Sequence, residues 1–200
     1  MTEKPTPGAV QRRTVVAGAA WTIPVVATAI GAPLAAASVT TPPQPPVCHQ
    51  FPPASTWTWQ VPRSGFVSFP FYFRDGERFA SSADATPGFG TATMAVLTTL
   101  EVVQGKRYHF TMPAFSNPVG SQWQSLNVYL NGQQVFAGTT RPLPGVEYIP
   151  PAGNTYHYEW TANATGPVQA VFEWMMPDTA GLNPPTNQDI NFTRPTVSCL

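Results

Sequence analysis

The 200-residue chain has few charged side chains: ten lysines and arginines, ten aspartates and glutamates, and a formal net charge of zero. Nucleic acids and anionic membranes are bound through dense basic surfaces, which this composition does not supply. If residues 1–37 are removed, as argued below, Lys4, Arg12, Arg13 and Glu3 leave, and seven basic and nine acidic residues remain. We therefore expect no nucleic acid among the partners.

The sequence also lacks the common signatures of enzymes and metal sites. It contains no Gly-x-Ser-x-Gly elbow, phosphate-binding loop, His-Glu-x-x-His pair or Cys-x-x-Cys pair. Its three histidines, His49, His109 and His157, are scattered along the chain. A lone histidine on a strand is usually solvent-facing or satisfied by a neighbour. We expect no catalytic residue, no metal site and no cofactor.

Only two cysteines are present, Cys48 and Cys199. They allow one intramolecular pairing, and in an oxidising compartment we expect it to form. Two unrelated buried thiols are the alternative. Closing so long a loop would stabilise the fold by roughly 4 to 5 kcal/mol in the loop-entropy model, and it would bring the first and last segments of the domain together.

What the chain does have near its start is a long uncharged run. Residues 14–38 follow Arg12 and Arg13 and contain no charged side chain. The run is long enough to span a bilayer, for which about 20 residues suffice. Its strong aliphatic residues are few, however, and glycine and proline interrupt it. A basic start, a modest apolar stretch and small residues up to Ala37 are the parts of an export signal, so we expect cleavage after Ala37; an uncleaved anchor is the alternative.

Arg12-Arg13 followed by Thr14-Val15-Val16 resembles the twin-arginine export motif. In that motif one variable residue and two apolar residues follow the arginine pair, and the weakly apolar stretch that comes next agrees with it. The whole segment resembles the leaders of secreted and wall-associated proteins of high-GC Gram-positive bacteria. The resemblance implies a secreted or cell-surface protein whose only membrane contact is the transient one of its export signal.

Residues 38–47, SVTTPPQPPV, contain four prolines and predict an extended spacer. After the spacer, apolar and polar residues alternate over short segments that proline and glycine separate, and no segment shows a convincing helical period. We therefore expect residues 48–200 to form a single all-β domain, an antiparallel jelly-roll-like β-sandwich, preceded by the apolar N-terminal segment.

Several segments predict individual strands. In TWTWQV, Trp57, Trp59 and Val61 share one face, and FVSFPFYF places Val67, Phe69, Phe71 and Phe73 on one face in the same way. Pro70 lies within this second run and favours an edge strand or a bulge, because proline has no amide donor. Three turns between strands are predicted by glycine-containing pairs: Gln104-Gly105, Asn131-Gly132 and Gly166-Pro167.

The order TLEVVQGKRYHFTM, LNVYLNGQQVF, YEWTANATGPVQAVFEW and DINFTRPTV resembles the jelly-roll β-sandwiches of carbohydrate-binding modules and related exported domains. The resemblance extends over about residues 92–197 and includes no catalytic signature. It implies a fold and, by analogy alone, a polysaccharide or cell-wall glycan as partner.

Aromatic side chains are the first candidates for such a ligand. Sugar rings stack on Trp and Tyr, while amides and carboxylates bind their hydroxyl groups. Trp57, Trp59, Trp123 and Tyr129 are the candidate binding residues. Core packing is the alternative for Trp57 and Trp59, and a half-exposed strand tyrosine is the alternative for Tyr129.

One acidic pair also follows from the pattern. If residues 156–176 form a hairpin with both aromatic sets on one face, Glu159 lies opposite Glu173, with His157 two residues along. Like charges directly opposite each other are destabilising, so such a pair would require a shared proton, a cation or a substrate. The alternatives are a different register or two carboxylates that point freely into water.

Three classes of function remain. We expect an exported, non-catalytic binding or surface domain, with a carbohydrate as its candidate ligand. A structural or adhesive envelope protein is the first alternative, and it would present an exposed sheet edge or apolar patch. A small secreted hydrolase is the second, and it would need a cleft with carboxylates at catalytic separation.

Overall fold

The computed structural model describes residues 48–199 of the chain. The predicted export signal, with Arg12, Arg13 and the cleavage site after Ala37, and the predicted spacer lie outside the described residues. Within residues 48–199, a 3-10 helix, η1 (Ala54–Thr56), precedes the first strand, and no helix is both long and apolar enough to span a membrane.

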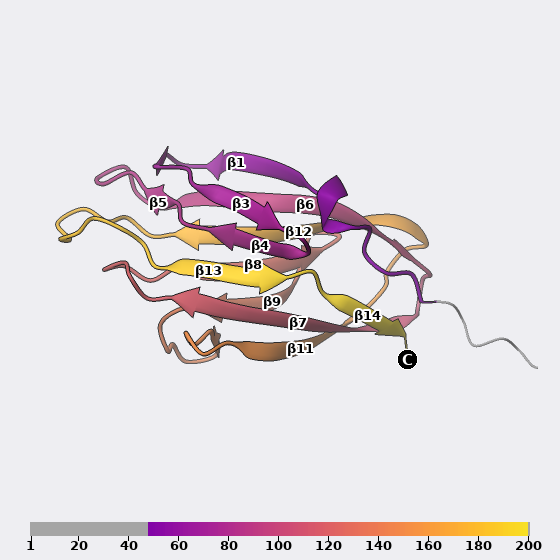
Figure 1. Ribbon diagram of the computed structural model, residues 1–200. Coiled ribbons are helices and arrows are strands. Elements are labelled where there is room, and N and C mark those ends of the chain that lie inside the picture. Colours follow the sequence, from indigo (N-terminus) through magenta and orange to yellow (C-terminus); the bar gives the residue numbers. More distant parts are fainter. Residues whose placement is uncertain (1–47, 200) are drawn as a thin grey trace, which may run out of the picture. The chain divides into compact units, whose positions relative to one another are not determined.

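Two six-stranded sheets form the two layers of a sandwich (Figure 1). The first sheet has the order β1 (Thr58–Ser64), β6 (Ala92–Val102), β12 (Gly166–Met176), β8 (Ser125–Leu130), β9 (Gln133–Thr139), β10 (Glu147–Tyr148). The second has the order β11 (Asn154–Thr161), β7 (Arg107–Asn117), β13 (Asp189–Thr193), β4 (Arg78–Ser81), β3 (Tyr72–Asp75), and β14 (Thr196–Cys199) pairs with β7. A small ladder joins β2 (Val67–Ser68) to β5 (Asp84–Ala85). All pairings between these strands are antiparallel except that of β9 with β10.

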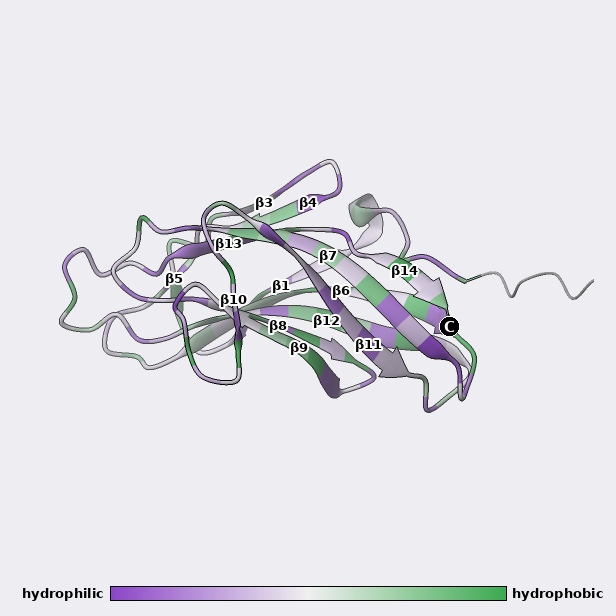
Figure 2. Ribbon diagram, turned by 90° about the horizontal axis from the view of Figure 1, so that it is seen from below, coloured by the Kyte–Doolittle hydropathy of each residue, from purple (hydrophilic) through white to green (hydrophobic). Residues whose placement is uncertain are grey.

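The core lies between the inner faces of the two sheets. Strand β7 buries every second residue, and its alternating apolar and polar bands are visible in Figure 2. Because successive side chains of a strand point to opposite faces, this alternation places one face of each sheet in the core and the other in solvent. Aromatic rings fill much of the space: Phe192 stacks on Phe79 and on Phe172, with ring centroids 5.0 Å apart in each pair. The all-β, antiparallel, jelly-roll-like sandwich predicted from the sequence is confirmed.

The predicted turns divide into one that is confirmed and two that are not hairpins. Asn131-Gly132 connects β8 to β9, and both residues have positive φ angles, 49° and 77°, as a tight hairpin turn requires. Strands β6 and β7 exist on either side of Gln104-Gly105, but they belong to different sheets. Strands β11 and β12 are likewise in different sheets. The reason is that both inner faces of a sandwich point into one core, so two consecutive strands with matching apolar faces can lie in opposite layers.

The predicted bond between Cys48 and Cys199 is confirmed, and it closes one end of the sandwich. The Gln50 side chain holds the same two segments together: its Oε1 accepts a hydrogen bond from the Val197 amide at 2.9 Å, and its Nε2 donates one to the Val197 carbonyl. We call this region the disulfide end. In Figure 1 it lies on the right, where the C-terminus is marked.

The aromatic run around Pro70 forms an edge, as its proline predicts. Strand β3 is the last strand of the second sheet, and Pro70 lies between β2 and β3. The predicted common face is wrong: Val67 packs against the core, whereas Phe69, Phe71 and Phe73 are exposed. The backbone of Phe69 has a φ of 53°, which breaks the strand and ends the alternation there.

Candidate ligand-binding cleft

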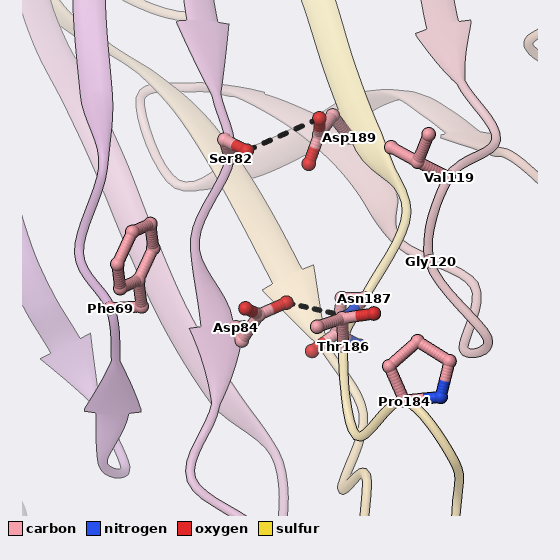
Figure 3. A pocket seen from close by; sticks show the side chains of 9 residues that line it. All are labelled: Phe69, Ser82, Asp84, Val119, Gly120, Pro184, Thr186, Asn187 and Asp189. Atoms are coloured by element: carbon pink, nitrogen blue, oxygen red, sulfur yellow. Dashed lines mark hydrogen bonds between the residues drawn. The ribbon is translucent and has the colours of Figure 1, made fainter.

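A cleft of about 520 Å³ lies at the end of the sandwich opposite the disulfide. Strand β7 connects the two ends: its Tyr108 pairs with Cys199, and its Asn117 pairs with Asp189 of the cleft. Nine residues of extended chain place these two positions roughly 30 Å apart. We call this region the cleft end. Four stretches of the chain line the cleft (Figure 3), through Phe69, Ser82, Asp84, Val119, Gly120, Pro184, Thr186, Asn187 and Asp189.

Asp189, the first residue of β13, is a buried carboxylate in this lining. It accepts hydrogen bonds from Ser82 Oγ at 3.3 Å and from Asn117 Nδ2 at 3.5 Å (the first is drawn in Figure 3). Burial is the main reason that the pKa of Asp189 is raised to about 6, and the charge of Asp84 raises it as well. The group can therefore change its protonation state in mildly acidic solution.

Asp84 is the second carboxylate of the cleft. Its Oδ1 accepts a hydrogen bond from the Asn187 amide at 2.6 Å, and its burial raises its pKa. A carboxylate fixed by one protein donor can accept further hydrogen bonds from the hydroxyl groups of a ligand. A carboxyl group with a pKa of about 6 beside a second carboxylate is also what acid catalysis requires, so the hydrolase alternative has a defined place to be tested.

The walls of the cleft are tied together by the side chain of Asn187, which is buried. Its Oδ1 accepts a hydrogen bond from the Ala85 amide at 2.9 Å. Its Nδ2 donates to the carbonyls of Trp123 and Pro177, at 3.2 and 3.1 Å. One amide group thus joins strand β5, the loop between β7 and β8, and the start of its own loop between β12 and β13. Gly120 lies so close to the Asn187 backbone that no side chain fits there.

Phe69 supplies an aromatic wall to the cleft, and 73% of its surface is exposed. Its φ of 53° is unusual for a bulky residue, and such strain is concentrated at functional sites. Val119, also exposed, lines the same cleft. An apolar ring beside carboxylates and amides is the composition that a sugar ring requires, since a sugar presents apolar faces and a rim of hydroxyl groups.

Two of the predicted binding residues, Trp57 and Trp59, pack in the core. The Trp57 ring lies 4.7 Å from that of Phe79, and its Nε1 donates a hydrogen bond to the Pro52 carbonyl at 2.9 Å. The Trp59 ring stacks on Trp174 at 5.5 Å. Core packing, the alternative raised for both, describes their positions.

Trp123 lies at the cleft end, next to the cleft but not among its lining residues. Its carbonyl is bound by Asn187, as described above, and its side chain is partly buried. It lines a separate pocket of about 300 Å³ together with Arg141 and Gln188. The role of Trp123 in binding stays a prediction.

Tyr129 and Glu173 meet on the outer face of the first sheet, away from the cleft. The pKa of Tyr129 is raised by burial and by the negative charge of Glu173. Glu173 Oε2 also lies 3.0 Å from Arg63 Nε. With its charge matched by an arginine, this carboxylate is part of a compact polar cluster on the sheet surface.

The predicted opposition of Glu159 and Glu173 is wrong. Glu159 is on β11, paired with β7, where it lies opposite His109 and 3.6 Å from its Nδ1. His157, on the same outer face, stacks on His109 with ring centroids 5.4 Å apart. Because β11 and β12 are in different layers, their outward-pointing carboxylates are on opposite faces of the sandwich.

Sequence reasoning missed Phe69, Asp84 and Asp189 as site residues. They are far apart in the chain, and only the packing of the small ladder against β13 and its preceding loop brings them together. One signal was available: Pro70 interrupts an aromatic run and so marks a place where a ring can leave the core. Among residues 48–199, histidine, cysteine and acidic side chains form no group of three that could hold a metal ion.

No protein-family model and no curated protein matches the chain. The solved structures that resemble it include a CBM4 structure, at 19% identity and a TM-score of 0.44, with 72% of this chain and 86% of that chain covered. A cyclase from Fischerella sp. TAU gives 10% identity and a TM-score of 0.42, with 79% and 91% covered. The CBM36-1 domain of a multidomain xylanase from the hindgut metagenome of Trinervitermes trinervoides has 13% identity and a TM-score of 0.39, with 71% of this chain and 96% of that chain covered. These likenesses are too distant to place the chain in a family or to indicate a ligand.

Proposed function

We propose that the protein is an exported, non-catalytic domain that binds a neutral carbohydrate in the cleft between Phe69, Asp84 and Asp189. The observation that supports this most is the exposed Phe69 ring beside two carboxylates that hydrogen bonds hold in place. The ring offers an apolar surface to the face of a sugar. The carboxylates accept hydrogen bonds from its hydroxyl groups, and their charge disfavours an anionic ligand.

Export is part of the same proposal. Residues 1–37 act as a twin-arginine-type signal that is removed, residues 38–47 act as a spacer, and residues 48–200 work as one domain outside the cytoplasm, secreted or at the cell surface. The disulfide between Cys48 and Cys199 agrees with this, because such bonds persist in oxidising compartments. N-terminal sequencing of the exported protein tests it: a first residue of Ser38 is expected, and a protein that keeps Arg12 and Arg13 contradicts it.

Binding is tested with a panel of soluble neutral wall and plant polysaccharides in affinity electrophoresis and calorimetry. Phe69→Asn removes the ring and tolerates the positive φ, and Asp84→Asn removes a charge at constant size. Each is expected to weaken binding roughly tenfold. Val103→Ala, an exposed apolar residue outside the cleft, is the matched control. No binding to any polysaccharide, or equal binding by all variants, contradicts the proposed cleft.

The same panel distinguishes a binding domain from a hydrolase. A binding domain leaves the polysaccharide intact, so no new reducing ends are expected. Release of reducing ends that Asp189→Asn abolishes and Val103→Ala leaves unchanged would replace the binding proposal with a hydrolase.

A structural or adhesive role is the second candidate, and the edge of the second sheet favours it. Strand β3 is an edge strand. Phe71, just before it, and Phe73, within it, are exposed, with ring centroids 5.8 Å apart. Exposed edges and apolar patches mark association surfaces. Sedimentation velocity tests this role: concentration-dependent association that Phe73→Ser abolishes, in a protein that binds no polysaccharide, would support it.

A further inference from the structure

Two exposed phenylalanines form a pair at the cleft end that the cleft itself does not include. Phe66 is 62% exposed and Phe89 is 60% exposed, and their ring centroids lie 5.2 Å apart. Phe66 precedes β2, and Phe89 lies in the loop between β5 and β6. Single exposed apolar residues are common, whereas two large rings in contact on adjacent loops form a surface. We call this surface the Phe66–Phe89 platform.

Hydrogen bonds fix the loop that presents Phe89. The carboxylate of Asp178 accepts hydrogen bonds from the amides of Gly88 and Gly90, at 2.8 and 3.1 Å, and these bonds hold the pKa of Asp178 below its usual range. The Phe89 amide itself donates to the Thr86 carbonyl at 3.2 Å. The backbone on both sides of Phe89 is therefore fixed, and with it the position from which the ring projects.

The chain around Phe66 is equally constrained. Gly65 lies against the backbone of Thr91 and Ala92 so closely that a side chain has no room there. The Thr86 amide donates to the Phe66 carbonyl at 2.8 Å, which continues the ladder between β2 and β5 by one rung. Both rings of the platform thus project from backbone that the fold determines.

The platform continues the cleft along one face of this ladder. Ser68 pairs with Asp84 and Val67 pairs with Ala85. Side chains two residues apart share a face of a strand, so Phe66 is on the same face as Ser68 and its partner Asp84. Phe66 is displaced from Ser68 by about 7 Å along the strand. A ligand lying in the cleft at Asp84 and extending along the ladder would reach the platform next.

Charge limits what the platform can bind. Both rings lie in uncharged parts of the chain: residues 64–73, which include Phe66, and residues 85–100, which include Phe89, contain no charged side chain. Asp178 binds the loop of Phe89, and Asp84 and Asp189 line the adjoining cleft. Arg63, just before the first range, is paired with Glu173, so the remaining carboxylates disfavour an anionic membrane surface. Flat apolar rings beside hydrogen-bond acceptors suit a neutral chain of sugar rings, with apolar faces for the platform and hydroxyl groups for the cleft.

We propose that the Phe66–Phe89 platform is a second aromatic subsite, so that the protein binds an extended stretch of a neutral polysaccharide over the cleft and the platform together. The inference rests on the proposed function, and it adds the class of ligand: a polymer or long oligosaccharide, bound along its length. A ligand of one or two sugar units fills the cleft alone.

The test compares ligand length with the site of substitution. The probe is whichever neutral polysaccharide of the panel binds, together with its own oligosaccharides from two units upward. Phe66→Ala and Phe89→Ala are expected to weaken binding of the polymer and of long oligosaccharides roughly two- to tenfold, while binding of the shortest oligosaccharide stays unchanged. Phe69→Asn is expected to weaken binding at every length, and Val103→Ala at none.

The outcomes separate this inference from the proposed function. If no carbohydrate binds, the proposed function fails and the inference fails with it. If Phe69→Asn weakens binding at every length but Phe66→Ala and Phe89→Ala behave like Val103→Ala, the proposed function stands and the second subsite is overturned. Loss of binding to phosphatidylcholine vesicles, or of self-association in sedimentation, in Phe66→Ala and Phe89→Ala with unchanged polymer affinity would also overturn it.

Discussion

The two ends of the sandwich are built in different ways. At the disulfide end the first and last described segments are joined by a covalent bond and by the Gln50 amide, and the connection between β8 and β9 is a two-residue turn. At the cleft end strands shorten to two residues in β2 and β5, and a long loop separates β12 from β13. Figure 1 shows this loop extending from the left side of the sheets.

The difference concerns where polar and apolar groups are placed. The cleft end has a buried carboxyl group, Asp189, and a partly buried one, Asp84, both with raised pKa values, together with a strained Phe69 and exposed phenylalanines. These features lower the stability of the domain without a ligand. The disulfide end has the one covalent cross-link of residues 48–199. We infer that the disulfide end contributes stability and that the cleft end uses part of it to hold a site.

The largest expected effect comes from removing the cross-link. Cys48 and Cys199 are 151 residues apart, so their bond restricts the unfolded chain strongly. The double variant Cys48→Ser/Cys199→Ser is expected to lose about 5 kcal/mol of unfolding free energy in the loop-entropy model. Urea denaturation of variant and wild type measures the loss, with reduced wild-type protein as the control.

The contrast between the two ends also predicts how this cysteine variant binds polysaccharide. Because the cleft lies roughly 30 Å away, polysaccharide affinity is expected to stay unchanged wherever the variant is still folded. A folded variant with weakened binding would show that the disulfide end also shapes the site, and the division between the ends would then be wrong.

The fold was accessible from the sequence because its signals are local. Alternating apolar residues define each strand, as in β7, and Asn131-Gly132 specifies its turn through the positive φ angles that it accepts. The assignment of strands to layers was not accessible in this way. Alternation predicts that Glu159 and Glu173 point away from the core, but it does not tell which of the two sheets each residue belongs to.

The cleft depends on contacts between distant parts of the chain. Asp84 is held by the Asn187 amide, and Asp189 is bound by Ser82, more than 100 residues earlier. No short motif records such contacts. Trp123 was a candidate because its loop is polar, which is a local property of the sequence, and that loop lies beside the cleft.

The next largest effect is expected at the cleft end, from Gly120→Ala. A methyl group at Gly120 would overlap the backbone of Asn187 and Gln188, so the loop between β7 and β8 must move away from the cleft wall. Overpacking of this kind costs roughly 1 to 3 kcal/mol. Urea denaturation is expected to show this loss, and calorimetry is expected to show weaker polysaccharide binding.

Ser121→Ala, one residue along in the same loop, is the matched control, because Ser121 is exposed. It is expected to leave both measurements unchanged. If Gly120→Ala retains full affinity, the position of this loop does not matter for binding, and the cleft end is less exacting than its packing indicates.

The smallest effect is expected from pH, and it has opposite signs for two carboxyl groups of the cleft end. The pKa of Asp189 is raised from 3.8 to about 6 in the folded state, mainly by burial. Between these values the folded protein binds more protons than the unfolded one, so the unfolding free energy falls as pH rises from about 4 to about 6. The pKa of Asp178 is lowered by backbone amides, so its stabilisation is present above pH 3.8 and is lost as pH falls below that value.

Thermal unfolding between pH 3 and 7 separates the two groups. Asp189→Asn is expected to reduce the fall in stability between pH 4 and 6 to the part that Asp84 contributes, because burial raises the pKa of Asp84 as well. Asp178→Asn is expected to leave that fall in place and to remove stabilisation above pH 4. If the proposed cleft requires an ionised Asp189, polysaccharide affinity rises over the same interval in which stability falls. If stability and affinity instead rise together through pH 6, ionisation of Asp189 does not destabilise the fold, and the contrast drawn between the two ends is wrong at this residue.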